Sequence, residues 1–468
     1  MRASVVGLGK LGLCLAAVLS SNGYDVTGID VVPRTIEQVN KGRSPIFEPG
    51  LGKILKAQRK HLRATSDFKE ILSTRVTFVV VPTPSDESGM FSLKFVESAM
   101  TGIGCEIAAK KSYHLVVLVS TVMPGSMDNF VRPLLERTSG KVPGKDFGLC
   151  YNPEFIALGD VIKGMQEPDF VLIGESDRKA GLELARIQRR ICKNSPPIER
   201  MNFVNAELAK ISVNSFVTMK MSFANTLAEI CEKIPGGDVD KVTTAIGRDR
   251  RIGRKYLRGA QGYGGPCFPR DNIAFATFAR SLGAQAEIAL ATHKVNLLQV
   301  TRVLEILKKG GVIPPSRIGV LGLSYKPNTN VLEASQSVML ARELIGRGYD
   351  VLAFDPAVFP GSKEITSLGI SLSETLGDCT DSSDVCVIAT PWKEFYENAV
   401  KFSGKTVIDL WRLSDAIEKI ASRYIAIGRN PDLGKEFPFE YLKNLAPEEL
   451  IAGVTKEVSM KEINVVGG

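Results

Sequence analysis

A single cysteine of this chain stands in surroundings that suit a catalytic nucleophile. Cys267 lies in the stretch G-Y-G-G-P-C-F-P-R-D (residues 262–271), whose glycines allow the backbone to approach a ligand closely. A helical pattern begins at Asp271, and a helix N-terminus together with Arg270 would favour the thiolate form of the cysteine. An isolated cysteine is more often a buried structural residue, but these flanking residues favour covalent chemistry at Cys267.

Two polar side chains share one face of a long predicted helix. The run A-E-L-A-K-I-S-V-N places Lys210 and Asn214 four residues apart, which brings them to the same side of a helix. The helical pattern covers residues 203–235 and meets no glycine or proline before Pro235. A helix of about 30 residues spans roughly 45 Å. We therefore expect it to link domains or to build a dimer interface.

The first residues carry a dinucleotide-binding pattern. Gly7, Gly9 and Gly12 form G-x-G-x-x-G between a predicted strand and a predicted helix, and Asp30 ends the next strand. In this context the glycines permit a tight turn and the close approach of a pyrophosphate to the helix N-terminus. Asp30 would accept hydrogen bonds from the ribose hydroxyls and repel a 2′-phosphate, so the sequence predicts NAD rather than NADP. The predicted cofactor contacts are Gly7, Gly9, Lys10, Leu11, Gly12, Asp30, Thr83 and Thr121.

Further predicted strands end at residues suited to a site. The strand at 76–81 runs into Thr83, and the strand at 115–119 runs into Thr121. The carboxyl ends of parallel strands meet the cofactor in such sheets. A strand near 147–150 leads to the segment N-P-E-F, which contains Glu154.

The third part of the chain repeats the first. The segment N-G-Y-D-V-T-G-I-D (22–30) is echoed by R-G-Y-D-V-L-A-F-D (347–355), and a strand at 318–321 opens the second unit. Its turn reads G-L-S-Y-K, with Lys326 in place of the phosphate-binding glycines, so we expect it to bind a phosphorylated ligand other than NAD. The sequence thus predicts an α/β fold with two Rossmann-like, doubly wound parallel-sheet domains joined by a long central helix and a helical dimerisation domain. The predicted limits are 1–200 for the NAD domain, 201–305 for the helical domain, 315–445 for the second Rossmann-like domain, and 446–468 for a polar tail typical of disorder.

Composition restricts the class of protein. The 468 residues carry a net charge of +8, which fits either a solvated basic surface or the handling of anionic ligands. No basic tract suggests nucleic-acid binding, and no apolar stretch is long enough to span a membrane. The eight cysteines contain no CxxC pair, so we expect no metal site and no disulfide framework, but reduced thiols in a cytoplasmic enzyme. The apolar run at 11–19 could pass for a signal peptide, but its context fits a buried strand and helix better.

Over about residues 1–440 the sequence resembles the UDP-glucose/GDP-mannose dehydrogenase family. The family motif G-F-G-G-S-C-F-x-K-D is similar to residues 262–271, with Tyr263, Pro266 and Arg270 as substitutions, and the order of domains matches. The resemblance implies oxidation of a sugar alcohol at carbon 6 to a carboxylate with two NAD. Its expected substrate is a nucleotide sugar, with UDP-glucose first among the candidates, and its expected state is a homodimer or higher homo-oligomer.

The resemblance also implies roles for individual residues. Cys267 would attack an aldehyde to give a thiohemiacetal and then a thioester. Lys210 and Asn214 would stabilise the developing oxyanion and handle its proton, and Asp271 would position or activate the hydrolytic water. The implied catalytic set is Cys267, Lys210, Asn214, Asp271, Glu154 and Thr121, the last two working through water. The implied substrate contacts are Glu154, Phe155, Lys210, Asn214, Tyr256, Gly264, Tyr325, Lys326, Arg412 and Arg251, the last lent to the neighbouring subunit.

Three departures from the family pattern stand out. Leu158 replaces the second glutamate of N-P-E-F-L-x-E-G, Glu333 stands where an arginine near the NAD is usual, and Pro266 replaces a serine. The first bears on the sugar contacts and the second on NAD affinity. None removes a catalytic group.

Alternatives remain open at the level of the sequence. The same chemistry could act on GDP-mannose or on a UDP-N-acetylhexosamine. A two-electron β-hydroxyacid dehydrogenase shares the opening domain and a helical lysine but needs neither Cys267 nor a second Rossmann unit, and the three histidines fall outside every motif. A non-catalytic NAD-binding module would be expected to lack one of Lys210, Asn214, Cys267 or Asp271, yet all four are present.

Overall fold

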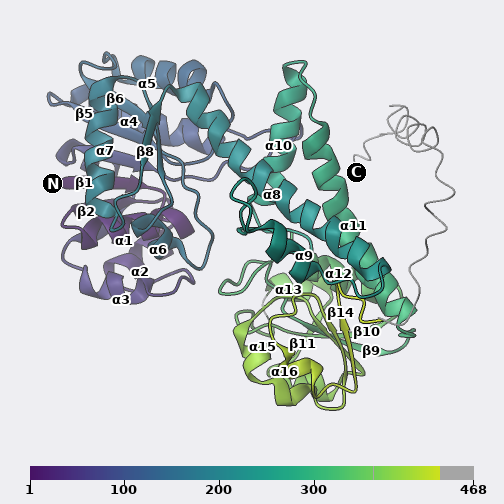
Figure 1. The fold of residues 1–468 in the computed structure, drawn as a ribbon. Helices are drawn as coiled ribbons and strands as arrows, with labels where there is room; N and C mark the ends of the chain where they lie inside the picture. The colour runs from purple at the N-terminus through teal and green to yellow at the C-terminus, as the bar shows by residue number, and fades with distance from the viewer. Residues whose placement is uncertain (362, 433–468) are drawn as a thin grey trace.

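The computed structural model describes residues 1–361 and 363–432, and it contains two α/β units with a group of helices between them (Figure 1). Helix α8 runs from the first unit to the second, and α10 and α11 lie beside it. The predicted fold class is confirmed, with two Rossmann-like sheets joined by a long helix. The domain limits stay predictions, and the tail at 446–468 lies outside the described residues.

The first unit is built on an eight-stranded sheet in the order β3-β2-β1-β4-β5-β6-β7-β8. Neighbouring strands are parallel except for β6 and β7. The strands are β1 (Arg2–Val6), β2 (Asp25–Ile29), β3 (Leu62–Thr65), β4 (Val76–Val79), β5 (His114–Leu118), β6 (Phe147–Tyr151), β7 (Val171–Glu175) and β8 (Ile198–Met201). The helices are α1 (Lys10–Ser21), α2 (Pro33–Asn40), α3 (Leu51–Ala57), α4 (Lys94–Ala109), α5 (Arg132–Ser139), α6 (Val161–Gln166) and α7 (Arg178–Ile191), with short turns η1 (Phe68–Ser73) and η2 (Met127–Val131).

Alternating strand residues show that both faces of this sheet are covered. In β5, Leu115 and Val117 pack into one apolar cluster, whereas Val116 and Leu118 pack into another. Because successive side chains of a strand point to opposite faces, helices must close both sides. This explains why the central strands read as continuous apolar runs.

The central helices are α8 (Phe203–Lys233), α9 (Val239–Ile246), α10 (Phe268–Ser281) and α11 (Glu287–Lys309). Helix α8 has 31 residues and begins one residue after Asn202, whose side chain caps it by accepting a hydrogen bond from Asn205 N. Helix α10 begins directly after Cys267, three residues before the start at Asp271 that the sequence predicts. The long helix therefore carries Lys210 and Asn214 to the start of α10.

The second unit is a parallel six-stranded sheet in the order β11-β10-β9-β12-β13-β14. Its strands are β9 (Arg317–Leu321), β10 (Asp350–Phe354), β11 (Ser371–Leu372), β12 (Val385–Ile388), β13 (Thr406–Asp409) and β14 (Arg423–Ala426). Its helices are α12 (Gln336–Gly346), α13 (Lys363–Leu368), α14 (Leu376–Asp381), α15 (Lys393–Glu397) and α16 (Asp415–Glu418), with a turn at η3 (Ala399–Phe402).

The internal repeat extends to matching hydrogen bonds. In the first unit Leu8 N donates to Asp30 Oδ2 at 2.6 Å, and in the second Leu323 N donates to Asp355 Oδ2 at 2.8 Å. Each aspartate directly follows the strand beside the first strand of its unit. Both units therefore place their ligand-facing loops where the strand order reverses, between β1 and β4 and between β9 and β12.

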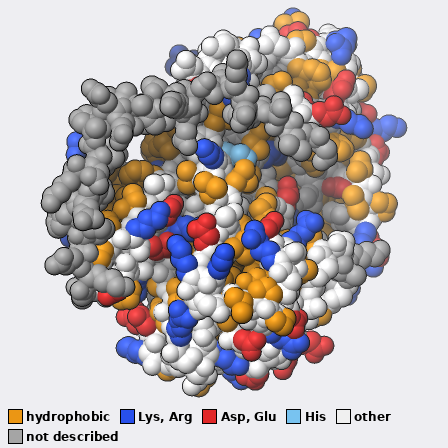
Figure 2. Space-filling view, turned by 90° about the vertical axis from the view of Figure 1, so that its right-hand side faces the viewer, with side chains coloured by type: hydrophobic (Ala, Val, Ile, Leu, Met, Phe, Trp, Pro, Cys, Tyr) orange, Lys and Arg blue, Asp and Glu red, His pale blue; other side chains and the backbone are white. Residues whose placement is uncertain are grey.

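Surface charge is spread over the face drawn in Figure 2, where basic and acidic side chains are interspersed among apolar ones. This distribution fits a solvated basic surface better than a concentrated polyanion groove. Within the described part of the chain, none of the helices is both long and apolar enough to cross a membrane.

Candidate active site

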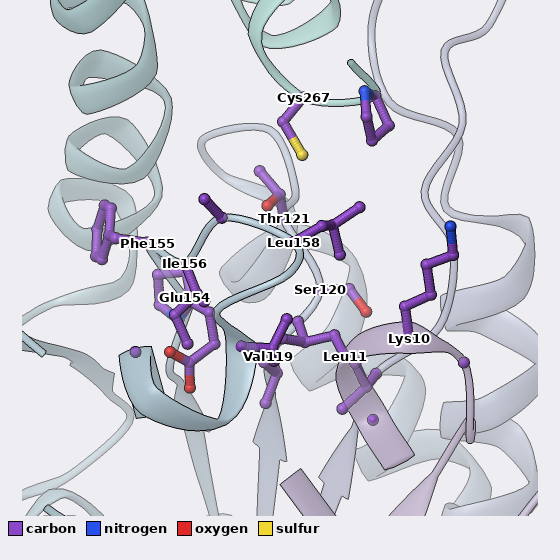
Figure 3. Close-up of a pocket in the computed structure, with 18 of the residues that line it drawn as sticks. Lys10, Leu11, Val119, Ser120, Thr121, Glu154, Phe155, Ile156, Leu158 and Cys267 are labelled. Carbon is purple, nitrogen blue, oxygen red and sulfur yellow. The ribbon is translucent and has the colours of Figure 1, made fainter. Parts of the chain in front are cut away.

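A cavity of about 1390 Å³ lies where the carboxyl end of the first sheet meets α8, the start of α10 and the loop after β9. Figure 3 shows Cys267 at one side of it, with its sulfur directed inward, and Lys10 and Leu11 of the glycine loop at another. The predicted residues that line the cavity are Gly7, Gly9, Lys10, Leu11, Gly12, Asp30, Thr83, Thr121, Glu154, Phe155, Lys210, Asn214, Tyr256, Gly264, Cys267, Tyr325 and Lys326. The structure thus brings both halves of the predicted site to one space.

The glycine loop has the geometry that a dinucleotide requires. A Cβ on Gly7 would lie 2.2 Å from Val80 O, and one on Gly12 would lie 1.9 Å from Gly7 O, so both positions need glycine for the turn and for helix–strand packing. Gly9, by contrast, has open space where its side chain would be. These three environments match the separate demands of turn, ligand approach and packing, and they fit a bound NAD.

Asp30 is held in place by the backbone on either side of it. Its two carboxylate oxygens accept hydrogen bonds from Leu8 N at 2.6 Å and from Val32 N at 2.8 Å. Each oxygen retains a second lone pair. The carboxylate also lines the cavity, so it can accept hydrogen bonds from ribose hydroxyls.

The loops after β4 and β5 are fastened to each other. Ser120 Oγ accepts from Val81 N at 2.9 Å and donates to Val81 O at 2.7 Å, and Thr83 Oγ1 donates to Thr121 O at 2.8 Å. These bonds hold Thr83 and Thr121 as one rigid edge of the cavity. The threonines predicted as cofactor contacts are therefore neighbours in space.

The cysteine loop packs tightly against the second unit. Gly265 has a φ of +83°, and a Cβ there would lie 2.5 Å from the Tyr325 ring. A Cβ on Gly264 would lie 2.3 Å from Ala334 O, and Gly265 N donates to Glu333 O at 3.1 Å. The glycines around Cys267 therefore let the nucleophile loop and the loop after β9 share one wall of the cavity.

The surroundings of Cys267 act on its thiol in opposite directions, and the predicted effect of Arg270 in favour of the thiolate is opposed by burial. Although the side chain opens into the cavity, the surrounding walls withdraw it from bulk water, and this burial raises the pKa of the thiol. Asp271 raises it further, whereas Arg270 and Lys210 lower it. The guanidinium of Arg270 is paired with Asp271, at 2.9 Å between Nη2 and Oδ1, so these two opposite charges act on the thiol together.

Lys210 and Asn214 both face the cavity from α8. Lys210 is 6% exposed, its Nζ donates to Glu154 O at 2.7 Å, and it lies 4.8 Å from the centre of the Phe155 ring. Burial lowers the pKa of its ammonium group, which makes a neutral amine more accessible near neutral pH. The sharing of one helical face predicted from the sequence is observed.

Asp271 lies behind the cavity surface and is fully buried. Its Oδ2 accepts from Asn214 Nδ2 at 2.6 Å, and its Oδ1 accepts from Arg270 Nε and Nη2. Both carboxylate oxygens are thus engaged by residues that do line the cavity. The structure indicates that Asp271 acts through Asn214 and Arg270. It does not line the cavity, so it does not contact a hydrolytic water directly, as the predicted role would require.

Glu154 stands near the start of the loop that follows β6, and it is among the residues that line the cavity (Figure 3). Burial raises the pKa of Glu154 to about 7, and the charge of Lys210 opposes that rise. A carboxyl group that titrates near neutral pH in a cavity is suited to proton transfer.

Two predicted arginines lie away from the cavity lining. Arg251 is strongly exposed, with 89% of its side chain accessible, and pairs with Asp249 at 2.6 Å. Arg412 is buried, and its Nε donates to Asp240 Oδ2 at 2.9 Å. The structure does not bring these two side chains to the rest of the site in one chain.

The sequence reasoning missed one buried carboxylate. Glu207 on α8 is fully buried, and its oxygens accept from Gly125 N at 2.7 Å and Met127 N at 2.8 Å, so it fixes the loop that follows Thr121. Its spacing from Lys210 and Asn214 is three and seven residues, which is one helical face. A charged residue on the same helical face as Lys210 and Asn214 was the sequence feature that could have identified Glu207.

Two nucleotide-binding folds around one cavity, with a glycine loop at one end and a thiol at the other, define a nicotinamide-dependent dehydrogenase of two Rossmann units. The chain belongs to the UDP-glucose/GDP-mannose dehydrogenase family. It matches the NAD binding domain of that family over residues 1–192, the central domain over 204–297 and the UDP binding domain over 319–416.

Similar proteins carry different substrate names. The chain is 34% identical to a UDP-glucose 6-dehydrogenase of Haloferax volcanii over 84% of this chain and 92% of that protein. It is 35% identical to a GDP-mannose 6-dehydrogenase of Pseudomonas aeruginosa over 88% of this chain and 96% of that protein. Among solved structures, a UDP-glucose dehydrogenase from Pyrobaculum islandicum superposes with a TM-score of 0.84 at 32% identity, covering 92% of this chain and 98% of that one. The family is therefore established, whereas the sugar is not.

Proposed function

We propose that this protein oxidises carbon 6 of a nucleotide sugar to a carboxylate, using two NAD and Cys267 as the nucleophile, with UDP-glucose as the substrate. The observation that carries the proposal is the opening of the Cys267 thiol into the same cavity as the glycine loop, Lys210 and Asn214. The glycine loop and Asp30 would hold NAD, which would supply the hydride acceptor for each of the two oxidations.

The residues of the cavity divide the work between them. Lys210 and Asn214 hold the substrate oxygen and handle its proton while the alcohol becomes an aldehyde. The sulfur of Cys267 then bonds to the aldehyde carbon, and the carbonyl oxygen gains a proton, which gives a thiohemiacetal. Loss of a hydride and that proton leaves a thioester.

Hydrolysis completes the reaction. A water held near Glu154 and Thr121 attacks the thioester carbon, the carbon–sulfur bond breaks, and the thiol regains its proton. Because burial raises the pKa of Glu154 to about 7, this carboxyl can accept a proton from the water near neutral pH. Asp271 keeps Asn214 in position during these steps.

The choice of UDP-glucose rests on likeness and not on a contact. The Haloferax relative and the Pyrobaculum structure carry that substrate in their names, and the UDP binding domain of the family matches the second unit. GDP-mannose is the second candidate, because a relative of nearly equal identity bears that name. The cytoplasmic location and the dimeric state stay predictions.

The proposal is tested by counting NADH against sugar. UDP-glucose, GDP-mannose and UDP-N-acetylhexosamines are incubated singly with the enzyme and excess NAD, and the products are identified by mass spectrometry. We expect two NADH and one uronic acid per UDP-glucose. Release of free aldehyde with a single NADH would contradict the thioester route, and preference for another sugar would correct the substrate alone.

A matched pair of variants separates the two oxidations. In Cys267→Ser the oxygen nucleophile gives a poorer intermediate, so overall turnover should fall by about three or more orders of magnitude while slow aldehyde formation survives. In Lys210→Ala aldehyde formation itself should fall, because charge stabilisation is lost in both oxidations. Single-turnover NADH release, with mass spectrometry of the trapped protein, distinguishes them. Parental activity in Cys267→Ser, with no adduct on the parent enzyme, points to hydroxyacid-dehydrogenase chemistry instead.

A further inference from the structure

Arg270 joins two parts of the molecule that carry different halves of the site. Its Nε and Nη2 donate to Asp271 Oδ1 at 3.0 and 2.9 Å on α10. Its Nη1 donates to Thr83 O at 3.1 Å, in the loop after β4 of the first unit. The guanidinium holds the two acceptors from different nitrogens of one rigid plane, a spacing that the single nitrogen of an ammonium group does not reproduce.

The connection continues in both directions from the guanidinium. On one side Asp271 Oδ2 accepts from Asn214 Nδ2 at 2.6 Å. The carboxylate that Arg270 holds therefore fixes the position of Asn214, which faces the cavity. On the other side Thr83 Oγ1 donates to Thr121 O at 2.8 Å. An unbroken series of hydrogen-bonded residues therefore runs from the cofactor loops to the face of α8.

The surroundings of Arg270 fix its position. The guanidinium carbon lies 4.6 Å from the centre of the Phe91 ring, an arrangement that favours a planar cation. Phe91 is 5% exposed and packs with Met123 of the first unit and with Ile211 and Ala274 of the central helices. Arg270 thus sits over the apolar contact between the first unit and the central helices, where a shift of either part would move it.

We propose that Arg270 is a positioning residue that couples NAD binding at the Thr83 loop to the placement of Asp271 and Asn214 beside Cys267. A ligand that orders the Thr83 carbonyl also orders the arginine that holds Asp271, and the reverse follows from linkage. The proposal goes beyond the proposed function because it concerns the cofactor and the thiol and holds for any sugar.

Two measurements on the whole enzyme, without any sugar, test it. NAD affinity is measured by titration calorimetry, and alkylation of Cys267 by iodoacetamide is followed by peptide mass spectrometry from pH 6 to 10. Cys105 is also exposed and serves as an internal standard, whereas the other six cysteines are buried. The charged and titratable groups facing the Cys267 thiol are Lys210 of α8, Arg270 and Asp271 of α10, and Glu333 and Tyr325 of the loop after β9.

Removing the guanidinium should affect both measurements. In Arg270→Met the thiol loses a cation that lowers its pKa and keeps the unscreened charge of Asp271, so its alkylation profile should move to higher pH. Alkylation at pH 8 should slow by about ten-fold, and the Kd for NAD should rise by about five-fold or more as the Thr83 carbonyl loses its donor. Arg75→Met is the matched control, because the side chain of Arg75 is 59% exposed and pairs with Glu183 elsewhere in the first unit.

Arg270→Lys separates coupling from mere support of the fold. Its charge should restore the alkylation profile of Cys267. Its three N–H groups share one nitrogen, however, and cannot reproduce the separate positions from which Nε and Nη2 hold Asp271 and Nη1 holds Thr83, so the Kd for NAD should stay raised. Parental NAD affinity in Arg270→Lys, or a parental alkylation profile in a folded Arg270→Met, overturns the proposal. If Arg270→Met does not fold, the NAD affinity of Arg270→Lys decides alone. Failure of the parent to oxidise nucleotide sugars would remove the proposed function and leave these results standing.

Discussion

Among single residues, the titration of the groups around the cavity is set by burial more than by charge pairing. The thiol of Cys267 and the carboxyl of Glu154 have raised pKa values, and the ammonium of Lys210 has a lowered one, each with burial as the largest cause. In every case the neutral form is favoured. Burial therefore moves each of these groups toward its neutral form relative to water, and at Cys267 it opposes ionisation of the thiol.

The pH dependence of the reaction should report Glu154. Its folded-state pKa of about 7 lies above the ordinary value of 4.5, so the group is protonated below about 7 and ionised above it. If the ionised form accepts the proton of the hydrolytic water, kcat should rise with pH through about 7. The raised pKa of Glu154 also affects the free energy of unfolding. The contribution of this group is fully present below its ordinary pKa of 4.5 and is lost as pH rises from 4.5 to about 7.

The variant Glu154→Gln should lower kcat and abolish the rise near neutral pH. Burial also raises the pKa of Glu207 to about 7, but the carboxylate of Glu207 is held by the backbone amides of Gly125 and Met127, so Glu207→Gln should retain the rise. Steady-state rates from pH 5.5 to 9 check this pair. If the rise of kcat near pH 7 were lost in Glu207→Gln and kept in Glu154→Gln, the titrating group would be Glu207 and not Glu154.

At the scale of elements, the start of α10 decides where the nucleophile stands. Cys267 immediately precedes the helix, and the two glycines shortly before it, Gly264 and Gly265, press against the loop after β9. Four of the non-glycine residues with positive φ, Tyr256, Asn328, Ala334 and Arg412, fall in the segments that surround this contact or in the second unit. Backbone strain of this kind persists where surrounding structure enforces it and is concentrated at ligand sites.

Gly265→Ala should therefore damage the site through two effects. The φ of +83° costs a non-glycine residue about 1–2 kcal/mol in the free energy of unfolding. The new Cβ would also lie 2.5 Å from the Tyr325 ring, which must move. We expect a lower Tm together with a fall in kcat/KM.

The control for this substitution is Gly50→Ala. Gly50 has a φ of +81°, but no heavy atom beyond its two chain neighbours lies within 4 Å of the position that its methyl group would take, so the variant carries the backbone cost without the clash. Gly50→Ala should lower the Tm and leave kcat/KM unchanged. Equal kcat/KM in both variants would show that the contact with Tyr325 does not matter for turnover.

For the whole molecule, the exposed surface of α8 and the position of Arg251 both bear on assembly. Phe216, Phe223 and Ile230 are 59%, 54% and 46% exposed and follow one another at seven-residue intervals, which places them near one side of the helix. Arg251 lies outside the cavity lining of its own chain and is strongly exposed. These features support the prediction that a second copy covers α8 and receives Arg251.

Mixed dimers give a direct test of that prediction. Arg251→Gln and Cys267→Ser should each be nearly inactive as homodimers, because each lacks one group in both sites. When the two are co-expressed, a mixed dimer contains one site with both groups intact, so activity should return to about a quarter of the parental level with random pairing. No recovery in chromatographically verified mixed dimers would show that Arg251 does not serve the neighbouring subunit.

Much of the architecture could be predicted because it depends on local patterns. The glycine spacing of the first loop, the repeated G-Y-D-V segment and the unbroken helical run each reflect short-range geometry. The first two are found where the sequence placed them, and the helix predicted over 203–235 is observed over Phe203–Lys233. Lys210 and Asn214 share a face because helical periodicity alone requires it. For the same reason Glu207 could have been included.

Local sequence patterns are enough to give the order of elements, the cofactor loop and most of the side chains that enter the cavity. The tertiary structure sets how strongly the charges of those side chains are screened. It buried Asp271 behind Asn214 and Arg270, it paired the charge of Arg270 with that carboxylate, and it turned the pKa of Cys267 upward where the neighbouring residues had suggested the opposite. The physical reason is that desolvation and charge pairing depend on which surfaces meet across the chain, and residues as distant as Thr83 and Arg270 meet only after folding.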